Sequence, residues 1–119
     1  MYTIRKQFTF SAAHRLVGLP PEHKCSNLHG HDYVVTVELR SEKLNSIGFV
    51  EDYRALSDIK TYLDEMLDHT FLNETLLFNP TAENMAKYFF DLFRKTHPLL
   101  SAVEVSETPK TNARYEATE

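Results

Sequence analysis

Apolar and polar residues alternate along two stretches near the start of the chain, and each alternation predicts a strand with one buried face. The even positions of the first stretch read Tyr2, Ile4, Lys6, Phe8, Phe10, Ala12 and His14. The second stretch follows His29-Gly30-His31 and places on one face Tyr33, Val35, Val37 and Leu39. Because strand side chains two residues apart project the same way, all three histidines are predicted on the buried faces.

Helical spacing of apolar residues predicts two helices. The first carries Leu56, Ile59, Leu63 and Met66-Leu67, with Asp52 as an N-terminal cap, and ends near Leu67-Asp68-His69. The second begins at Asn79-Pro80-Thr81, where Thr81 caps the helix and Glu83 suits its first turn, and Pro98 ends it.

Two further strands, 102–107 and 113–116, are predicted on either side of a hairpin turn at Pro109-Lys110-Thr111-Asn112. The element order is ββααββ. We therefore expect residues 1–119 to form a single α+β domain, a four-stranded antiparallel sheet with two helices on one face. The other face then needs water or another subunit.

Net charge, apolar segments and cysteine content limit the partners and the compartment expected for this protein. A formal net charge of -4 argues against nonspecific binding to nucleic acid or to an anionic membrane, both of which need a basic surface. The N-terminus lacks an apolar signal region, and no apolar run is long enough to span a membrane, so we expect a cytoplasmic protein. The single cysteine, Cys25, excludes an internal disulfide and fits a reducing compartment.

His14, His29 and His31 form the candidate metal site. If the first two strands pair antiparallel, His14 at the end of one meets the two histidines at the start of the other. Imidazole is a usual zinc ligand, and a catalytic zinc takes about three protein ligands. A lone histidine at a strand end is more often a satisfied polar residue, so the pair His29 and His31 carries the prediction. His23 and His97, in polar or proline-flanked loops, are expected to be solvated.

Four other residues are candidates for a chemical role. Cys25 is either a small buried apolar residue, a reactive thiol beside Lys24, or a fourth zinc ligand that closes a structural site. Asp68-His69 is either a histidine favoured by a helix C-terminus or an acid–base pair. Glu107 ends a strand on its apolar face, where a carboxylate needs a partner.

The motifs of this chain resemble those of the 6-pyruvoyltetrahydropterin synthase family. They run in order over nearly the whole chain: Phe10-Ser11-Ala12-Ala13-His14-Arg15-Leu16, C-x-x-x-H-G-H at Cys25 to His31, Leu67-Asp68-His69, Asn79-Pro80-Thr81-Ala82-Glu83-Asn84 and Glu107-Thr108-Pro109. Within the family, the short C-x-x-x-H-G-H spacing and the compact length resemble the bacterial 6-carboxy-5,6,7,8-tetrahydropterin synthases of queuosine and 7-deazapurine biosynthesis.

The resemblance implies a set of roles. Zinc would be held by His14, His29 and His31, Cys25 would abstract a proton, and Asp68 with His69 would relay protons. Glu107 would anchor the pterin and join the relay, and Thr81 and Glu83 match a segment that contacts the pterin. The implied substrate is 7,8-dihydroneopterin triphosphate, and the implied products are 6-carboxy-5,6,7,8-tetrahydropterin, triphosphate and acetaldehyde.

The resemblance also implies the tunnelling fold, in which sheets of several subunits join into a barrel. The expected assembly is a homo-oligomer, a hexamer of two trimers, with active sites between subunits. Three alternatives remain open: a pyruvoyl-forming enzyme that eliminates triphosphate without cleaving the side chain, a noncatalytic zinc module with Cys25 as fourth ligand, and a cysteine hydrolase using Cys25 and His69.

Overall fold

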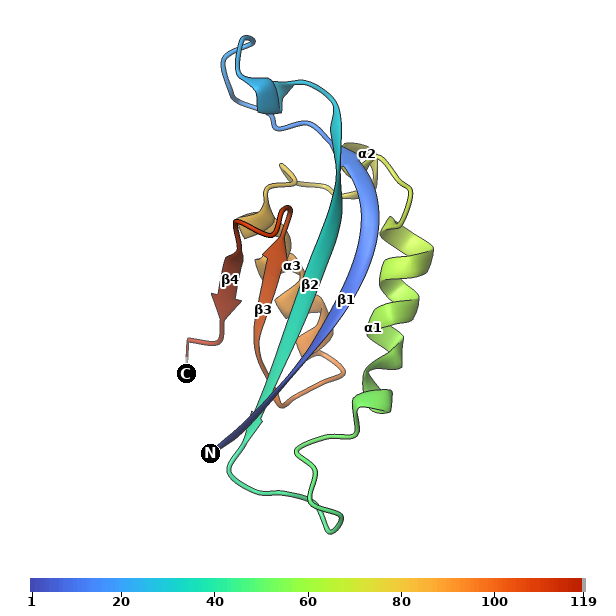
Figure 1. Ribbon diagram of the computed structural model, residues 1–119, viewed down its shortest axis with the longest axis vertical. Coiled ribbons are helices and arrows are strands. Elements are labelled where there is room, and N and C mark those ends of the chain that lie inside the picture. The colour runs from blue at the N-terminus through green and yellow to red at the C-terminus, as the bar shows by residue number, and fades with distance from the viewer. Residues whose placement is uncertain (119) are drawn as a thin grey trace.

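Four antiparallel strands form one sheet in the order β1-β2-β3-β4 in the computed structural model, which describes residues 1–118 (Figure 1). The strands are β1 (Tyr2–His14), β2 (His29–Ser41), β3 (Leu100–Ser106) and β4 (Ala113–Glu116). The predicted strands are confirmed, although β3 begins earlier than expected and ends one residue before Glu107. Since β3 pairs only with Val34–Leu39 of β2, the first residues of β2 extend past the end of β3.

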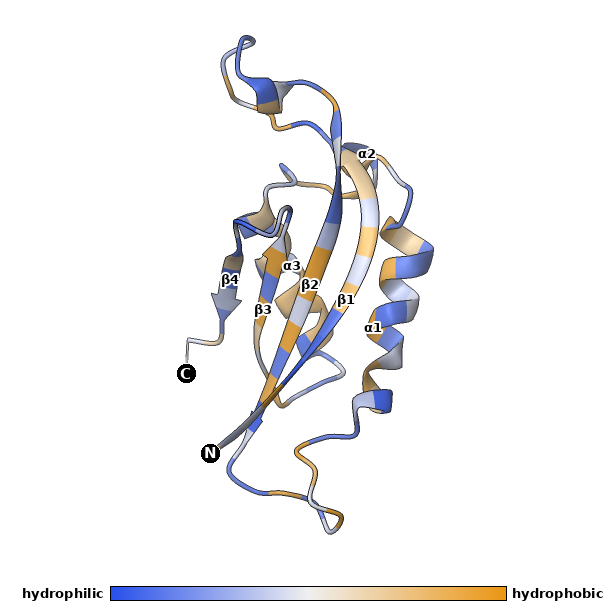
Figure 2. Cartoon of the chain, viewed as in Figure 1, coloured by the Kyte–Doolittle hydropathy of each residue, from blue (hydrophilic) through white to orange (hydrophobic). Residues whose placement is uncertain are grey.

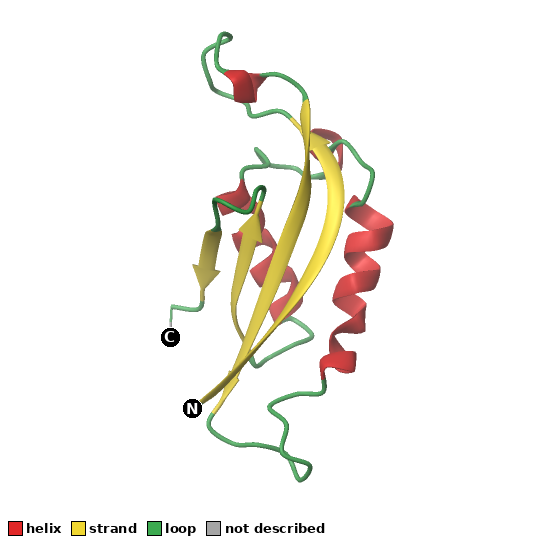
Figure 3. Cartoon of the chain, viewed as in Figure 1, coloured by secondary structure: helices red, strands yellow, loops and turns green. Residues whose placement is uncertain are grey.

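Helices cover one face of this sheet (Figure 3). A continuous helical segment comprises η2 (Tyr53–Leu56), α1 (Ser57–Tyr62) and η3 (Leu63–Leu67), and α3 spans Ala82–Arg94. Both predicted caps are present, because the Asp52 carboxylate accepts from the Arg54 amide and the Thr81 hydroxyl accepts from the Asn84 amide. No helix within residues 1–118 is long and apolar enough to cross a bilayer.

Two short elements, η1 (Lys24–Ser26) and α2 (Leu72–Thr75), were not expected from the sequence. Each is a single turn, too short for an apolar periodicity to develop.

The core lies between the sheet and the helices and takes in the apolar residues of the alternating strands. Figure 2 shows hydrophobic and hydrophilic residues alternating along β1 and β2. Phe10 and Tyr33 lie opposite one another on β1 and β2 and stack with ring centroids 4.9 Å apart. Phe89 of α3 meets Phe10 edge-on, with centroids 6.4 Å apart. This packing anchors the ends of β1 and β2 that carry the histidines.

The uncovered face of the sheet is charged. Arg5 of β1 and Arg114 of β4 both form ion pairs with Glu38 of β2 and Glu104 of β3. We call these four residues the charged cluster. Each arginine therefore joins strands that are not neighbours, and ion pairs link all four strands on the exposed face.

The prediction that His97 is solvated is wrong. It is buried at 8% exposure, and its Nε2 lies 2.8 Å from Asp58 of α1. The chain after α3 turns back on itself, since the His97 amide donates to the Phe93 carbonyl, and this turn carries the ring against α1. The proline that suggested an open loop follows this turn.

Candidate metal centre

The three predicted histidines form one cluster at the end of the sheet. His14 is opposite His29 in the β1–β2 register, and His31 is one position further along the same face. One nitrogen from each ring lies within 4.8 Å of the others, and His14 is fully buried while His29 and His31 are half-buried. The prediction from strand alternation that these side chains meet is confirmed.

Hydrogen bonds set the ring orientation of two of the histidines. His14 Nδ1 lies 2.8 Å from the Pro80 carbonyl, and His29 Nδ1 lies 2.7 Å from the Asn27 carbonyl. A carbonyl only accepts, so each Nδ1 carries a proton, and in the neutral ring Nε2 then presents a lone pair. This is how metal-binding histidines are held in proteins, with the second nitrogen donating to an oxygen.

The two lone pairs face each other, because His14 Nε2 and His29 Nε2 are 3.0 Å apart. Two unprotonated nitrogens at this distance repel unless a proton or a cation lies between them. Nitrogen ligands of one tetrahedral zinc are separated by about 3.3 Å, given zinc–nitrogen bonds of about 2.05 Å. The donor set and its spacing therefore fit a zinc ion.

Burial favours the neutral form of two of the three rings, those of His14 and His31. It lowers the pKa of His14, and the neighbouring His29 and His31 lower it further, against the opposing effect of the Pro80 carbonyl. Burial also lowers the pKa of His31, although the carboxylate of Glu107 acts in the opposite direction. At neutral pH both rings are therefore uncharged, as ligands must be.

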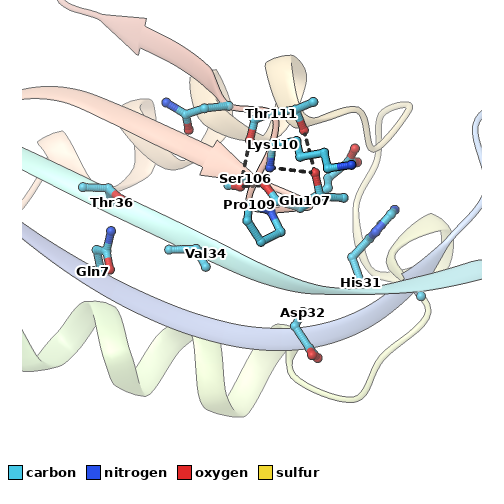
Figure 4. Close-up of a pocket in the computed structure, with 13 residues that line it drawn as sticks. Gln7, His31, Asp32, Val34, Thr36, Ser106, Glu107, Pro109, Lys110 and Thr111 are labelled. Carbon is cyan, nitrogen blue, oxygen red and sulfur yellow. Dashed lines mark hydrogen bonds between the residues drawn. The ribbon is translucent and has the colours of Figure 1, made fainter.

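Glu107 lies beside the cluster even though it follows the last residue of β3. Its Oε2 is 3.6 Å from His14 Nε2, and its side chain is one quarter exposed. A cavity of about 790 Å³ opens next to it, where β2 extends past β3. In Figure 4, His31 and Glu107 lie at one end of this cavity, and Asp32 projects from the opposite side of β2. Of the three histidines, His31 lines this cavity, so a small molecule bound there would contact the cluster through His31 and Glu107.

Asp68 and His69 are fixed against the outer edge of β1. The Ser11 amide donates to Asp68 Oδ1 at 2.8 Å, and Asp68 Oδ2 lies 2.7 Å from His69 Nδ1. The hydrogen bond from Ser11 and the one from His69 lower the pKa of Asp68, so its carboxylate is charged at neutral pH. The predicted carboxylate–imidazole pair is present as a hydrogen-bonded contact.

The backbone around this pair is unusual. The preceding turn, η3, is π-helical, and the Asp68 amide donates back to the Leu63 carbonyl. His69 has a φ of 61°, in the left-handed region that costs free energy for a residue with a side chain. Both features are frequent at functional sites, and here they leave the His69 side chain 83% exposed. His69 and His31 line a second cavity of about 570 Å³.

Cys25 is not part of the histidine cluster. It lies in η1, beyond the end of the sheet (Figure 1), and is partly exposed. His23 caps this turn, because its Nδ1 accepts the Cys25 amide at 3.1 Å. Within residues 1–118, the metal-binding group comprises the three histidines without Cys25, which is opposite to what a closed four-ligand site requires.

Thr81 and Glu83, the two further candidates for pterin contact, lie in different surroundings. The Thr81 hydroxyl is engaged as the cap of α3, whereas Glu83 is exposed and shares a cavity of about 220 Å³ with Glu107 and Thr111. Sequence reasoning missed the groups that orient His14: the Pro80 carbonyl and the hydroxyl of Tyr33, 3.0 Å from His14 Nδ1. The sequence indicated Asn79-Pro80-Thr81 as a helix start and a family motif and Tyr33 as a core residue, but neither pattern predicts a contact with His14.

Known proteins resemble this chain over almost its full length. The family described as 6-pyruvoyl tetrahydropterin synthase matches residues 3–118. The 6-carboxy-5,6,7,8-tetrahydropterin synthase of Synechocystis sp. is 39% identical, covering 97% of this chain and 93% of the relative. The 6-pyruvoyl tetrahydrobiopterin synthase of Drosophila melanogaster is 32% identical, covering 94% and 77%. The solved structure of Caenorhabditis elegans 6-pyruvoyl tetrahydropterin synthase superposes with a TM-score of 0.86 at 31% identity, covering 98% and 96%.

Proposed function

The chain belongs to the 6-pyruvoyl tetrahydropterin synthase family, and we propose that it is a zinc enzyme of the carboxy-forming branch. The reaction converts 7,8-dihydroneopterin triphosphate and water to 6-carboxy-5,6,7,8-tetrahydropterin, triphosphate and acetaldehyde, a step of queuosine and 7-deazapurine biosynthesis. The observation that carries the proposal is the cluster of His14, His29 and His31 beside Glu107, with His31 and Glu107 also lining a cavity. The monomer has the tunnelling fold that the sequence resemblance implied.

The three histidines would hold the zinc ion through their outward nitrogens. Zinc at this position would act as a Lewis acid toward the side-chain hydroxyls of the substrate. The protein's own contribution is to keep His14 and His31 neutral through burial, and to orient His14 and His29 through the carbonyls of Pro80 and Asn27. Three protein ligands leave a coordination position for substrate, as in catalytic zinc sites.

Cys25 would remove a carbon-bound proton from the substrate side chain, and His69 with Asp68 would carry protons as triphosphate leaves. The charged Asp68 carboxylate orients the imidazole through Nδ1, so Nε2 of His69 is the nitrogen that exchanges protons with substrate. The exposure of the His69 side chain supports this role, because a proton carrier must reach its partner.

Glu107 would anchor the pterin, since a carboxylate can accept two hydrogen bonds from an amino-pyrimidinone edge. Its Oε2 lies 3.6 Å from His14 Nε2, which supports a pterin held by Glu107 close to the histidine cluster. Glu83 shares a cavity with Glu107 and is the better placed of the two additional candidates. Thr81 would contribute to pterin binding indirectly, because it caps the start of α3, whose first turn carries Glu83.

A second candidate is the pyruvoyl-forming reaction, favoured by the similarity to the Drosophila and C. elegans proteins. The higher identity to the carboxy-forming relative and the short C-x-x-x-H-G-H spacing support our choice. A noncatalytic zinc module is disfavoured, because Cys25 lies outside the metal-binding group.

Product analysis tests the proposal. The purified protein is incubated with 7,8-dihydroneopterin triphosphate, the pterin is identified by mass spectrometry, and acetaldehyde is measured through its reduction by an added dehydrogenase. We expect 6-carboxytetrahydropterin with triphosphate and acetaldehyde in equal amounts. Triphosphate without acetaldehyde, with a pterin that keeps its three-carbon side chain, would assign the chain to the pyruvoyl-forming branch.

A further inference from the structure

The outer edge of β1 has no neighbouring strand, yet its last residues are hydrogen-bonded. The His69 amide donates to the Ser11 carbonyl at 2.6 Å, and the Ala13 amide donates to the Thr70 carbonyl at 3.0 Å. The connection between η3 and α3 thus occupies the place of a further strand. It attaches the segment that carries Asp68 and His69 to the strand that carries His14.

This edge pairing continues beyond the end of β1 through two side chains. The Arg15 amide donates to Asn73 Oδ1 at 2.9 Å, and Asn73 Nδ2 donates to the Arg15 carbonyl at 2.8 Å. The Val17 amide donates to Asn79 Oδ1 at 3.0 Å, and Asn79 Nδ2 donates to the Val17 carbonyl at 3.1 Å. Each carboxamide therefore binds both backbone groups of one residue, as a neighbouring strand would.

Leu16, between Arg15 and Val17, bonds to the backbone of Cys25 and not to an asparagine. The Leu16 amide donates to the Cys25 carbonyl at 2.7 Å. With Arg15 and Val17 fixed by the asparagines, Leu16 has a defined position, and it is two residues from the metal-ligand candidate His14. The backbone of Cys25 is thereby tied to the strand that carries the cluster.

Asn79 is also linked to the cluster through its neighbour in sequence. Asn84 Nδ2 and the Thr81 amide both donate to the Asn79 carbonyl, at 3.0 and 2.8 Å, which fixes this residue at the start of α3. The next carbonyl, of Pro80, orients His14. The segment Asn79-Pro80 thus binds the backbone of Val17, just after the candidate metal site, and also orients His14.

We propose that Asn73 and Asn79 are positioning residues for the reaction, whose carboxamides hold Arg15–Val17 so that Leu16 keeps Cys25 in register with the histidine cluster. The inference rests on the proposed function for the role of Cys25, but the hold on Cys25 is measurable without substrate. Neither asparagine contacts a reacting group in this assignment. Both act through the backbone of the segment that they bind.

Asparagine-to-aspartate substitutions test this role with little change in shape. In Asn73→Asp or Asn79→Asp the carboxylate still accepts from the backbone amide but faces the carbonyl oxygen, oxygen against oxygen. We expect kcat to fall about 10- to 100-fold, with a smaller change in KM, because misplacing a catalytic group by about 1 Å has that effect. Zinc content should stay at the wild-type level.

Alkylation of the single cysteine by iodoacetamide, followed by mass spectrometry, reports the hold on Cys25 directly. Its rate should rise about 2- to 10-fold, the effect on a local opening of losing one hydrogen bond. Asn45→Asp is the matched control, because only Oδ1 of Asn45 is engaged, accepting from the amides of Ile47, Gly48 and Phe49. That variant should match the wild type in every measurement.

Three outcomes would overturn the proposal: a lowered Tm with wild-type kcat and alkylation rate, loss of zinc in the variants, or equal effects in Asn45→Asp. If the wild-type protein does not turn over the pterin triphosphate, the proposed function fails while the alkylation rates still decide whether the asparagines hold Cys25. Should an aspartate variant fail to fold, Asn73→Ala and Asn79→Ala remove the carboxamide without opposing two oxygens.

Discussion

The second nitrogen of each imidazole determines what the histidine cluster can bind. For His14 and His29 that nitrogen donates to a backbone carbonyl, which leaves the facing nitrogens unprotonated and 3.0 Å apart. Tyr33 adds a hydroxyl 3.0 Å from His14 Nδ1, and burial raises the pKa of this tyrosine, so it remains a neutral hydrogen-bonding group. The cluster therefore has the hydrogen bonding expected of a metal site, with ring orientations set by the surrounding backbone.

Substitution separates the ligand histidines from the thiol. We expect Cys25→Ala to retain about one zinc per chain, within error of the wild type, and to lose at least about 100-fold in turnover as a missing base does. His29→Ala should lose both metal and activity, because it removes one of three ligands. Elemental analysis and the product assay measure the two effects. Loss of zinc in Cys25→Ala would favour the closed structural site.

At the scale of secondary-structure elements, the two faces of the sheet are stabilised differently. The covered faces pack as apolar side chains, whereas the uncovered face is joined across all four strands by the charged cluster. Hydrogen bonds from Arg5, and then from Arg114 and Asn112, lower the pKa of Glu104. Burial alone would raise the pKa of Glu38, but hydrogen bonds from Arg114 and Ser101 outweigh it and lower the value.

These shifts predict how stability depends on pH. A carboxyl whose folded pKa is depressed stabilises the fold above its ordinary value of 4.5, and this contribution is lost as pH falls below that value. Glu104→Gln should therefore lower the free energy of unfolding by about 1 kcal/mol at pH 7. At pH values well below the depressed pKa the variant and the wild type should unfold alike.

Thermal unfolding across this pH range measures the difference, with the exposed Glu65 as control in Glu65→Gln. A Tm difference between Glu104→Gln and the wild type that stays constant from pH 7 into the acid range would contradict the assignment.

At the scale of the whole molecule, the proposed catalytic groups are distributed over the chain. Within residues 1–118, no hydrogen bond or ion pair joins Cys25, Asp68 or His69 to the three histidines. His69 lies at the outer edge of β1 and exposes most of its side chain. The exposed His69 imidazole can therefore reach a second copy, and in its own chain it shares a cavity with His31. We therefore expect that His69 serves the metal site of a neighbouring subunit.

Complementation between inactive variants tests this arrangement. His29→Ala and His69→Ala should each be inactive alone. When the two are co-expressed, a site that takes its metal ligands from one chain and His69 from the next is intact in about one quarter of positions, from random assortment in a symmetric oligomer. Activity near that fraction is expected in the purified mixture. If the co-expressed protein is as inactive as either parent, each site is built from a single chain.

The sequence alone determined the strands, the caps at Asp52 and Thr81, and the meeting of His14 with His29 and His31. These follow from local periodicity, because a strand alternates every two residues and its register places the side chains. Only the tertiary structure decided which nitrogens of the cluster are free, that His97 is buried against Asp58, and that Asn73 and Asn79 bind Arg15 and Val17. These contacts join residues about 40 to 65 positions apart, and a side chain that bonds to distant backbone leaves no periodic signal.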